Sequence, residues 1–152
     1  MNLLYCGDSN IKDGLFLSIK SILKVEKEAL NIYVLSMDYL NYKKIDSDFI
    51  DYLDTLVKEV NKNSFVKLID MTNIYQEHEC KANKDTLFTP YCMLRLYSDL
   101  VDLPSKILYL DTDVLVYRSF KDFYNINNTN YELVGVLDYY GSHVYKKNPF
   151  KK

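Results

Sequence analysis

Short apolar runs alternate with amphipathic segments along the chain, and this alternation predicts strands that alternate with helices. Apolar and β-branched residues dominate 3–6, 31–36 and 65–69, three runs of the length expected for buried strands. Between them, apolar residues recur at helical spacing over 11–23 and 45–60, which predicts helices with one buried face. Successive strand–helix–strand units pack as right-handed crossovers on a mostly parallel sheet.

The second half of the chain continues this pattern less regularly. A polar, weakly periodic segment follows the third predicted strand, and we expect a loop there with at most a short helix. Thr89 and Pro90 form an N-cap and first-turn pair that predicts a helix to about Leu100. Further strands are expected over 106–110 and 133–137. The fold class expected is therefore α/β, a doubly wound, mostly parallel sheet with flanking helices.

Two aspartates interrupt the apolar stretch over 107–116. Asp111 and Asp113 are two positions apart, and in an extended chain that spacing puts both carboxylates on one face. We expect extended structure to resume over 114–117. Neighbouring carboxylates in an apolar setting repel each other and lose hydration, which a divalent cation relieves. Their hard oxygens suit Mg²⁺ or Mn²⁺, which complete their shells with water and substrate phosphates. The same pattern also occurs in solvent-exposed loops that bind no metal.

A second candidate site lies where the first predicted strand ends. Ligands of open α/β sheets bind beyond the carboxyl ends of the strands, and Asp8 and Asp111 are both expected at that edge. Gly7 permits close approach of the backbone, Asp8 can accept from a base or ribose hydroxyl, and the following helix offers free N–H groups to phosphate. A capped helix start explains the same residues, and the segment lacks the G-x-G-x-x-G dinucleotide pattern.

Composition narrows the class of protein. The 152 residues and 17.9 kDa suit one domain, and the net charge of −2 provides no positive field that would attract nucleic acid. No run approaches the roughly 20 apolar residues of a membrane span. Cys6, Cys80 and Cys92 form no C-x-x-C pair, so reduced thiols and a cytoplasmic location are expected.

The chain has fifteen tyrosines and no tryptophan, which raises the question of carbohydrate stacking. Tyr33 and Tyr109 lie in predicted strands, so we interpret them as core or sheet-face residues. Tyr139 and Tyr140 directly follow Asp138 and are the candidates for sugar contacts.

These motifs resemble those of glycosyltransferase family 8, which includes lipopolysaccharide galactosyl- and glucosyltransferases and glycogenin. The resemblance covers essentially the whole chain and rests on 3–10, 91–96, 106–116 and 134–138. It implies a GT-A fold of the nucleotide-diphospho-sugar transferase type. It also implies retaining transfer of glucose or galactose from a UDP-sugar to a saccharide acceptor, such as lipopolysaccharide or another cell-surface glycan.

The same resemblance assigns roles to particular residues. It implies that Mn²⁺ or Mg²⁺ is held in part by Asp111 and Asp113. Uridine is expected near Asp8 and Asn10, and Arg95 is expected to face the donor. The nucleotide-sugar site implied by the family consists of Asp8, Asn10, Arg95, Asp111, Thr112, Asp113 and Asp138, the last near the sugar cleft.

The family's acceptor-site segments and its late metal-binding histidine do not occur after Gly141. We therefore expect residues 1–152 to form a nucleotide-sugar-binding domain that is incomplete at the C-terminus, lacks the catalytic residues and self-associates. The complete enzyme is expected to be cytoplasmic and peripheral to the inner membrane face.

Two alternatives remain open. One is a non-catalytic fragment that binds UDP-sugar. The other is a haloacid-dehalogenase-like phosphatase, which also places D-x-D after a hydrophobic strand, although that strand normally opens the domain and continues Gly-Thr, whereas Val114 and Leu115 follow here.

Overall fold

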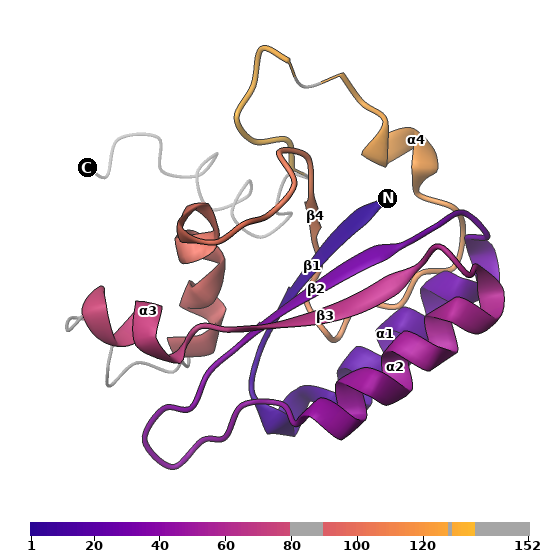
Figure 1. The fold of residues 1–152 in the computed structure, drawn as a ribbon. Helices are drawn as coiled ribbons and strands as arrows, with labels where there is room; N and C mark the ends of the chain where they lie inside the picture. Colours follow the sequence, from indigo (N-terminus) through magenta and orange to yellow (C-terminus); the bar gives the residue numbers. More distant parts are fainter. Residues whose placement is uncertain (80–89, 128, 136–152) are drawn as a thin grey trace, which may run out of the picture.

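The computed structural model describes residues 1–79, 90–127 and 129–135 (Figure 1). Within these ranges four parallel strands form one sheet in the order β3-β2-β1-β4. This confirms the expected α/β class with a parallel sheet. The strands are β1 (Asn2–Cys6), β2 (Asn31–Ser36), β3 (Phe65–Asp70) and β4 (Leu108–Tyr109).

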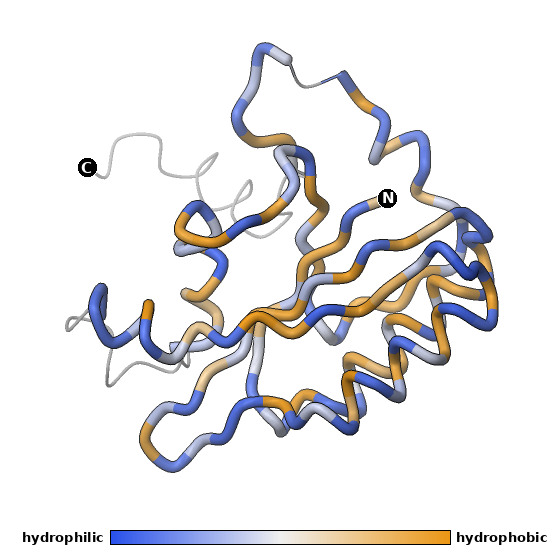
Figure 2. Tube along the Cα trace, viewed as in Figure 1, coloured by the Kyte–Doolittle hydropathy of each residue, from blue (hydrophilic) through white to orange (hydrophobic). Residues whose placement is uncertain are grey.

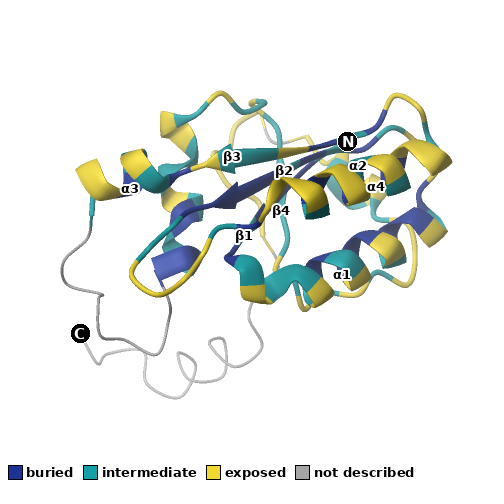
Figure 3. Ribbon diagram, turned by 60° about the horizontal axis from the view of Figure 1, so that its bottom comes forward, coloured by how far each residue is buried: buried dark blue, intermediate teal, exposed yellow. Residues whose placement is uncertain are grey.

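Helices cover both faces of the sheet. The longer pair, α1 and α2, lies on one face, and α3 and η3 lie on the other (Figures 1 and 3). In the part of the chain described, no helix is long and apolar enough to cross a membrane. The helices are η1 (Ser9–Ile11), α1 (Lys12–Val25), α2 (Ser47–Val60), α3 (Thr72–Glu77), η3 (Pro90–Leu100) and α4 (Lys121–Tyr124).

Strand β1 shows why the sheet needs cover on both sides. Its side chains alternate between the faces, so Leu3 and Tyr5 pack in the cluster beneath α1 and α2 while Leu4 packs in the cluster beneath α3 and η3. All three are buried. Hydrophobic residues accordingly follow one another along the strands but alternate with hydrophilic ones along α1 and α2 (Figure 2). A continuous apolar run is typical of a parallel strand that is buried on both faces.

The helix expected to about Leu100 is confirmed as η3, which is of the 3₁₀ type, but the later strands differ from expectation. Strand β4 pairs with β1 only at Leu108 and Tyr109. Residues 114–117 form no strand, and neither do 133–135, while 136 and 137 lie outside the described residues. Among the described residues, these segments have no neighbouring strand to pair with. An extended segment needs such a strand to form hydrogen bonds with its backbone N–H and C=O groups.

Tyr5 predicts how stability responds to alkaline pH. Burial raises the pKa of Tyr5 to about 12, although its hydroxyl also shares a 2.9 Å hydrogen bond with Ser18 Oγ. The unfolded chain ionises at an ordinary tyrosine pKa near 10, so stability is fully present below about pH 10 and is lost as pH rises toward 12. We expect the free energy of unfolding from urea titrations to fall between pH 9 and pH 11.5. The fall should be shallower in Tyr5→Phe, and equal slopes would contradict this assignment.

Candidate functional site

Two turns that carry polar residues expected from the sequence leave the sheet at its carboxyl edge. Strands β1 and β4 are parallel neighbours, with Leu4 opposite Tyr109, and the Leu110 N–H donates to Leu4 O at 3.0 Å. The segments that follow the two strands, 7–11 and 111–114, therefore leave the sheet at the same edge. The expectation that Asp8 and Asp111 share this edge is met.

The first turn fixes Asp8 through its own backbone. Asp8 is 7% exposed and caps η1, since its carboxylate accepts from the Asn10 N–H and from Asn10 Nδ2, both at 3.0 Å. The Ser9 N–H donates to Lys43 O at 2.8 Å, which ties the turn to the loop that follows β2. Gly7 leaves no room for a side chain, because a Cβ there would lie 2.4 Å from Ile11 Cδ1. The turn thus places a carboxylate and an amide side by side.

The second turn is not the extended segment that the spacing of its aspartates indicates. The Val114 N–H donates to Asp111 O at 3.1 Å, which closes a turn over 111–114. That part of the prediction is wrong because pairing with β1 stops at Leu110, after which the chain folds back over α1. Both carboxylates are nevertheless accessible: the Asp111 side chain is 59% exposed, and Asp113 is also exposed.

Helix α1 supports this second turn from below. A Cβ at Gly14 would lie 2.9 Å from Thr112 O, so the turn rests directly on the helix backbone. The Val116 N–H then donates to Ser21 Oγ at 2.9 Å and holds the following segment along α1. The one sequence signal for this contact is the glycine itself, since glycine inside a helix is unfavourable and marks a close approach.

Gly14→Ala tests this support. We expect the methyl group to displace the turn while the alanine favours α1 by about 0.5–1 kcal/mol. Amide NMR shifts should therefore change most at 111–114, with thermal stability retained. Glu59→Ala, on the exposed face of α2, serves as the control and should leave those shifts in place. An unperturbed turn in Gly14→Ala would show that it does not rest on residue 14.

Arg95, Tyr109 and Asp111 form one cluster at the second turn. The Tyr109 hydroxyl donates to Asp111 Oδ1 at 2.5 Å, and Arg95 Nη2 lies 3.7 Å from the same oxygen. The Arg95 guanidinium carbon lies 4.1 Å from the centroid of the Tyr109 ring, and its Nε donates to Cys92 O at 2.7 Å. Burial, followed by the bond to Asp111, raises the pKa of Tyr109. Sequence reasoning placed Tyr109 in the sheet but missed its contact with the aspartate.

Cys6 lies beside this cluster at the end of β1. Burial raises the pKa of its thiol to about 12, with the positive charge of Arg95 acting in the opposite direction. Burial thus favours the protonated thiol over the thiolate that nucleophilic cysteines use.

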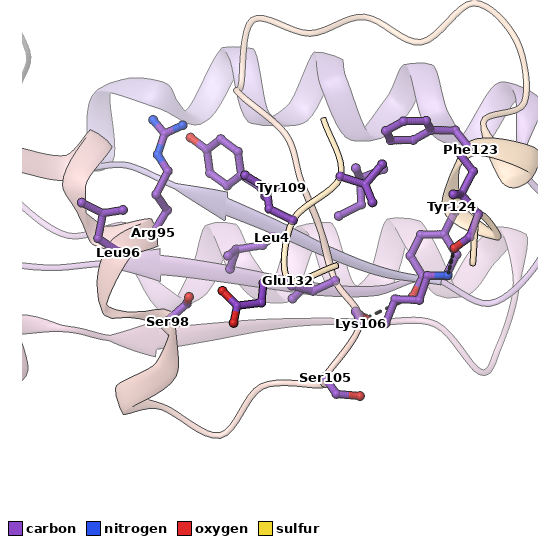
Figure 4. Close-up of a pocket in the computed structure, with 15 residues that line it drawn as sticks. Leu4, Arg95, Leu96, Ser98, Ser105, Lys106, Tyr109, Phe123, Tyr124 and Glu132 are labelled. Carbon is purple, nitrogen blue, oxygen red and sulfur yellow. Dashed lines mark hydrogen bonds between the residues drawn. The ribbon is translucent and has the colours of Figure 1, made fainter. Parts of the chain in front are cut away.

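A cavity of about 610 Å³ adjoins the cluster on the face that carries η3 (Figure 4). Arg95, Tyr109 and Glu132 line it at one end, and Tyr124 and Lys106 line it at the other. Asp8 and the two aspartates of the second turn are not among its lining residues. The cavity therefore contains neither turn and adjoins the second one through Arg95 and Tyr109.

The donor set suits a hard cation that is shared with a ligand. Among the described residues no group of three or more His, Cys, Asp or Glu side chains forms a closed metal site. Asp113 makes no hydrogen bond or ion pair within the same residues, which leaves its oxygens available. Two carboxylates provide part of a Mg²⁺ or Mn²⁺ shell, which water and phosphate oxygens then complete. Asp138, Tyr139 and Tyr140 lie outside the described residues.

Comparisons with known proteins identify the family and the fold of the chain. The model of the family "Glycosyl transferase family 8" matches residues 2–152, whereas no curated protein sequence is significantly similar. The fold is similar to that of the galactosyltransferase LgtC in complex with donor and acceptor sugar analogues, with 17% identity and a TM-score of 0.65. It is also similar to that of the glycosyltransferase GlyE of Streptococcus pneumoniae TIGR4, with 21% identity and a TM-score of 0.56.

The chain spans less than half the length of these two proteins. The match covers 86% of this chain and 44% of LgtC, and 83% of this chain and 27% of GlyE. The family match displaces the phosphatase alternative, and the two structural likenesses show the fold. The chain belongs to glycosyltransferase family 8, and its described residues have a GT-A type of fold.

Proposed function

We propose that this chain binds the nucleotide part of a UDP-sugar and contributes the donor side of a retaining hexosyltransferase. The observation that carries the proposal is the meeting of two polar turns at the carboxyl edge of neighbouring strands, one with Asp8 and Asn10 and one with Asp111 and Asp113. That edge is where open α/β sheets bind their ligands. Membership in family 8 supports a glycosyl donor as the ligand.

Uridine is proposed to bind at the first turn. The Asp8 carboxylate is nearly buried and already held by two bonds from Asn10, so it can accept from a ribose hydroxyl or base N–H with little further ordering. Each carboxylate oxygen can accept more than one hydrogen bond, so the two bonds from Asn10 leave capacity for such a donor. A carboxylate acceptor favours a nucleoside, which provides N–H and O–H donors, and disfavours a ligand that carries only negative charge.

The diphosphate is proposed to bind at the second turn. Asp111 and Asp113 would hold Mn²⁺ or Mg²⁺, which when bound supplies positive charge that stabilises the leaving diphosphate. Thr112 lies between them in the same turn, and Arg95 brings a guanidinium to it, a group suited to phosphate oxygens. Asp138 is proposed to lie near the sugar.

The acceptor is proposed to be a saccharide. LgtC binds donor and acceptor sugar analogues, which supports a nucleotide sugar and a sugar acceptor as the two substrate classes. Glucose or galactose is the proposed hexose, and lipopolysaccharide or another cell-surface glycan is the proposed acceptor. A glycan of that kind would place the complete enzyme on the cytoplasmic face of the membrane. A chain that binds the donor without transferring the sugar is the alternative within the same proposal.

Calorimetry tests the donor proposal. UDP is titrated into the chain with Mn²⁺, with Mg²⁺ and with excess chelator, and GDP and ADP are titrated with Mn²⁺. We expect heat from UDP binding only when a divalent cation is present, and weaker binding of GDP and ADP. Equal affinity for UDP with and without chelator would reject the metal role, and equal affinity for the three nucleotides would reject the uridine site.

A further inference from the structure

We propose that Tyr109 is a positioning residue whose hydroxyl holds the Asp111 carboxylate in the orientation that binds a divalent cation. The inference rests on the proposed function, since the cation site at Asp111 is part of it. Its first observation is the bond from the Tyr109 hydroxyl to Asp111 Oδ1, at 2.5 Å. Bonds from a hydroxyl to an ionised carboxylate have lengths of about 2.5–2.7 Å and are among the strong ones in proteins.

The second observation is that Tyr109 is itself firmly held. Its backbone belongs to β4 and pairs with Leu4 of β1. Arg95 covers its ring, with the guanidinium carbon 4.1 Å from the ring centroid, and Figure 4 shows the two side chains next to each other. Arg95 is tied in turn by its Nε to Cys92 O at 2.7 Å. The phenol oxygen therefore has a fixed position from which to orient Asp111.

The third observation is that the exposed Asp111 carboxylate is contacted at one of its two oxygens. Its side chain is 59% exposed on a turn, where it is free to rotate unless another group holds it. Tyr109 binds Oδ1 and Arg95 approaches the same oxygen at 3.7 Å, so both donors act on one side of the carboxylate. Oδ2 is left to face a cation. Carboxylates that bind metals are themselves commonly held by hydrogen bonds of this kind.

Tyr109→Phe isolates the hydroxyl, because the ring and its contact with Arg95 are kept. Binding of Mn²⁺ alone is measured by electron paramagnetic resonance of the free ion, without nucleotide. We expect the variant to bind Mn²⁺ about 10-fold more weakly, or worse, as is usual when the partner of a metal ligand is lost. Unchanged Mn²⁺ affinity, or no Mn²⁺ binding by the unaltered chain, would overturn the proposal.

Tyr124→Phe is the matched control. Tyr124 lines the same cavity, and its hydroxyl donates to Lys106 O at 3.2 Å and accepts from the Asn2 N–H at 3.1 Å. Neither bond involves Asp111, so we expect Mn²⁺ affinity to stay as in the unaltered chain. An equal loss in both phenylalanine variants would mean that a general loosening of β4 causes the effect, and the proposal would be wrong.

A double-mutant cycle asks whether Tyr109 acts through Asp111. In an Asp111→Ala background, Tyr109→Phe should cause no further loss of Mn²⁺ affinity, since the carboxylate that it orients is gone. A full additional loss would overturn the positioning role. UDP binding is measured separately: a chain that binds Mn²⁺ through Asp111 and Tyr109 but does not bind UDP would reject the proposed function and leave this inference supported.

Discussion

Replacing Asp113 with alanine is expected to weaken UDP binding in the presence of Mn²⁺ by roughly 100-fold, and to leave the titration in excess chelator, where no binding is expected, as it is. The loss of a residue that only supports a metal ligand costs about 10- to 100-fold in affinity, so the loss of a ligand should reach the upper end of that range. Asp113 is the cleaner choice of the two aspartates. It makes no hydrogen bond or ion pair within the described residues, whereas Asp111 contacts Tyr109 and Arg95.

The control for Asp113→Ala is Asp51→Ala. Asp51 is also exposed but lies on α2, so both variants change the net charge of the chain equally. Calorimetry at one salt concentration then separates a ligand effect from a change in overall charge. We expect Asp51→Ala to bind UDP as the unaltered chain does. Full metal-dependent affinity in Asp113→Ala would show that the second turn does not hold the cation.

Asp8→Ala is the second substitution from which we expect a large effect. Loss of a hydrogen bond to a charged group costs about 1.5–3 kcal/mol, which corresponds to roughly a 10- to 150-fold weaker affinity for UDP. The same substitution removes the cap of η1, which typically costs about 1 kcal/mol of stability. The free energy lost in UDP binding should therefore exceed the roughly 1 kcal/mol lost in folding stability.

Asp46→Ala provides the matched comparison, because Asp46 is also an aspartate N-cap. It accepts from the Phe49 N–H at 2.9 Å at the start of α2, and its carboxylate also pairs with Lys12, the first residue of α1. We expect it to lower the thermal unfolding temperature and to leave UDP affinity intact. If Asp8→Ala and Asp46→Ala had the same effect on UDP binding, Asp8 would be a structural cap only.

The parts of the fold that could be predicted from the sequence are those set by local patterns. The prediction of β2 over 31–36 is confirmed to the residue, because β-branched and aromatic residues are concentrated there. Helices α1 and α2 are confirmed within two residues at each end, because one apolar face repeats at helical spacing over their whole length. Asp8 and Asp111 lie at one edge because each follows a strand of a parallel sheet. The alternation of strands and helices in the sequence already predicts such a sheet.

The details of the second turn could not be predicted, because they depend on contacts between distant segments. The extent of β4 depends on how far β1 runs beside it, and this decides that Asp111 and Asp113 lie in a turn. A glycine inside α1 indicates a close approach at Gly14, but no local pattern specifies which segment approaches it or that Tyr109 bonds to Asp111. Glu26 is a similar case: it is buried at the end of α1, where it accepts from Ser119 Oγ and the Phe120 N–H.

The most direct test of a shared cation and nucleotide site at the two turns is paramagnetic line broadening. Amide NMR spectra of the labelled chain with UDP are recorded while Mn²⁺ is added in small amounts. The expected result is the strongest broadening at 111–114, clear broadening at 8–10, and little at 27–30, which precede β2 at the opposite edge of the sheet. Broadening that is centred away from both turns, or that is unchanged in Asp113→Ala, would contradict the account.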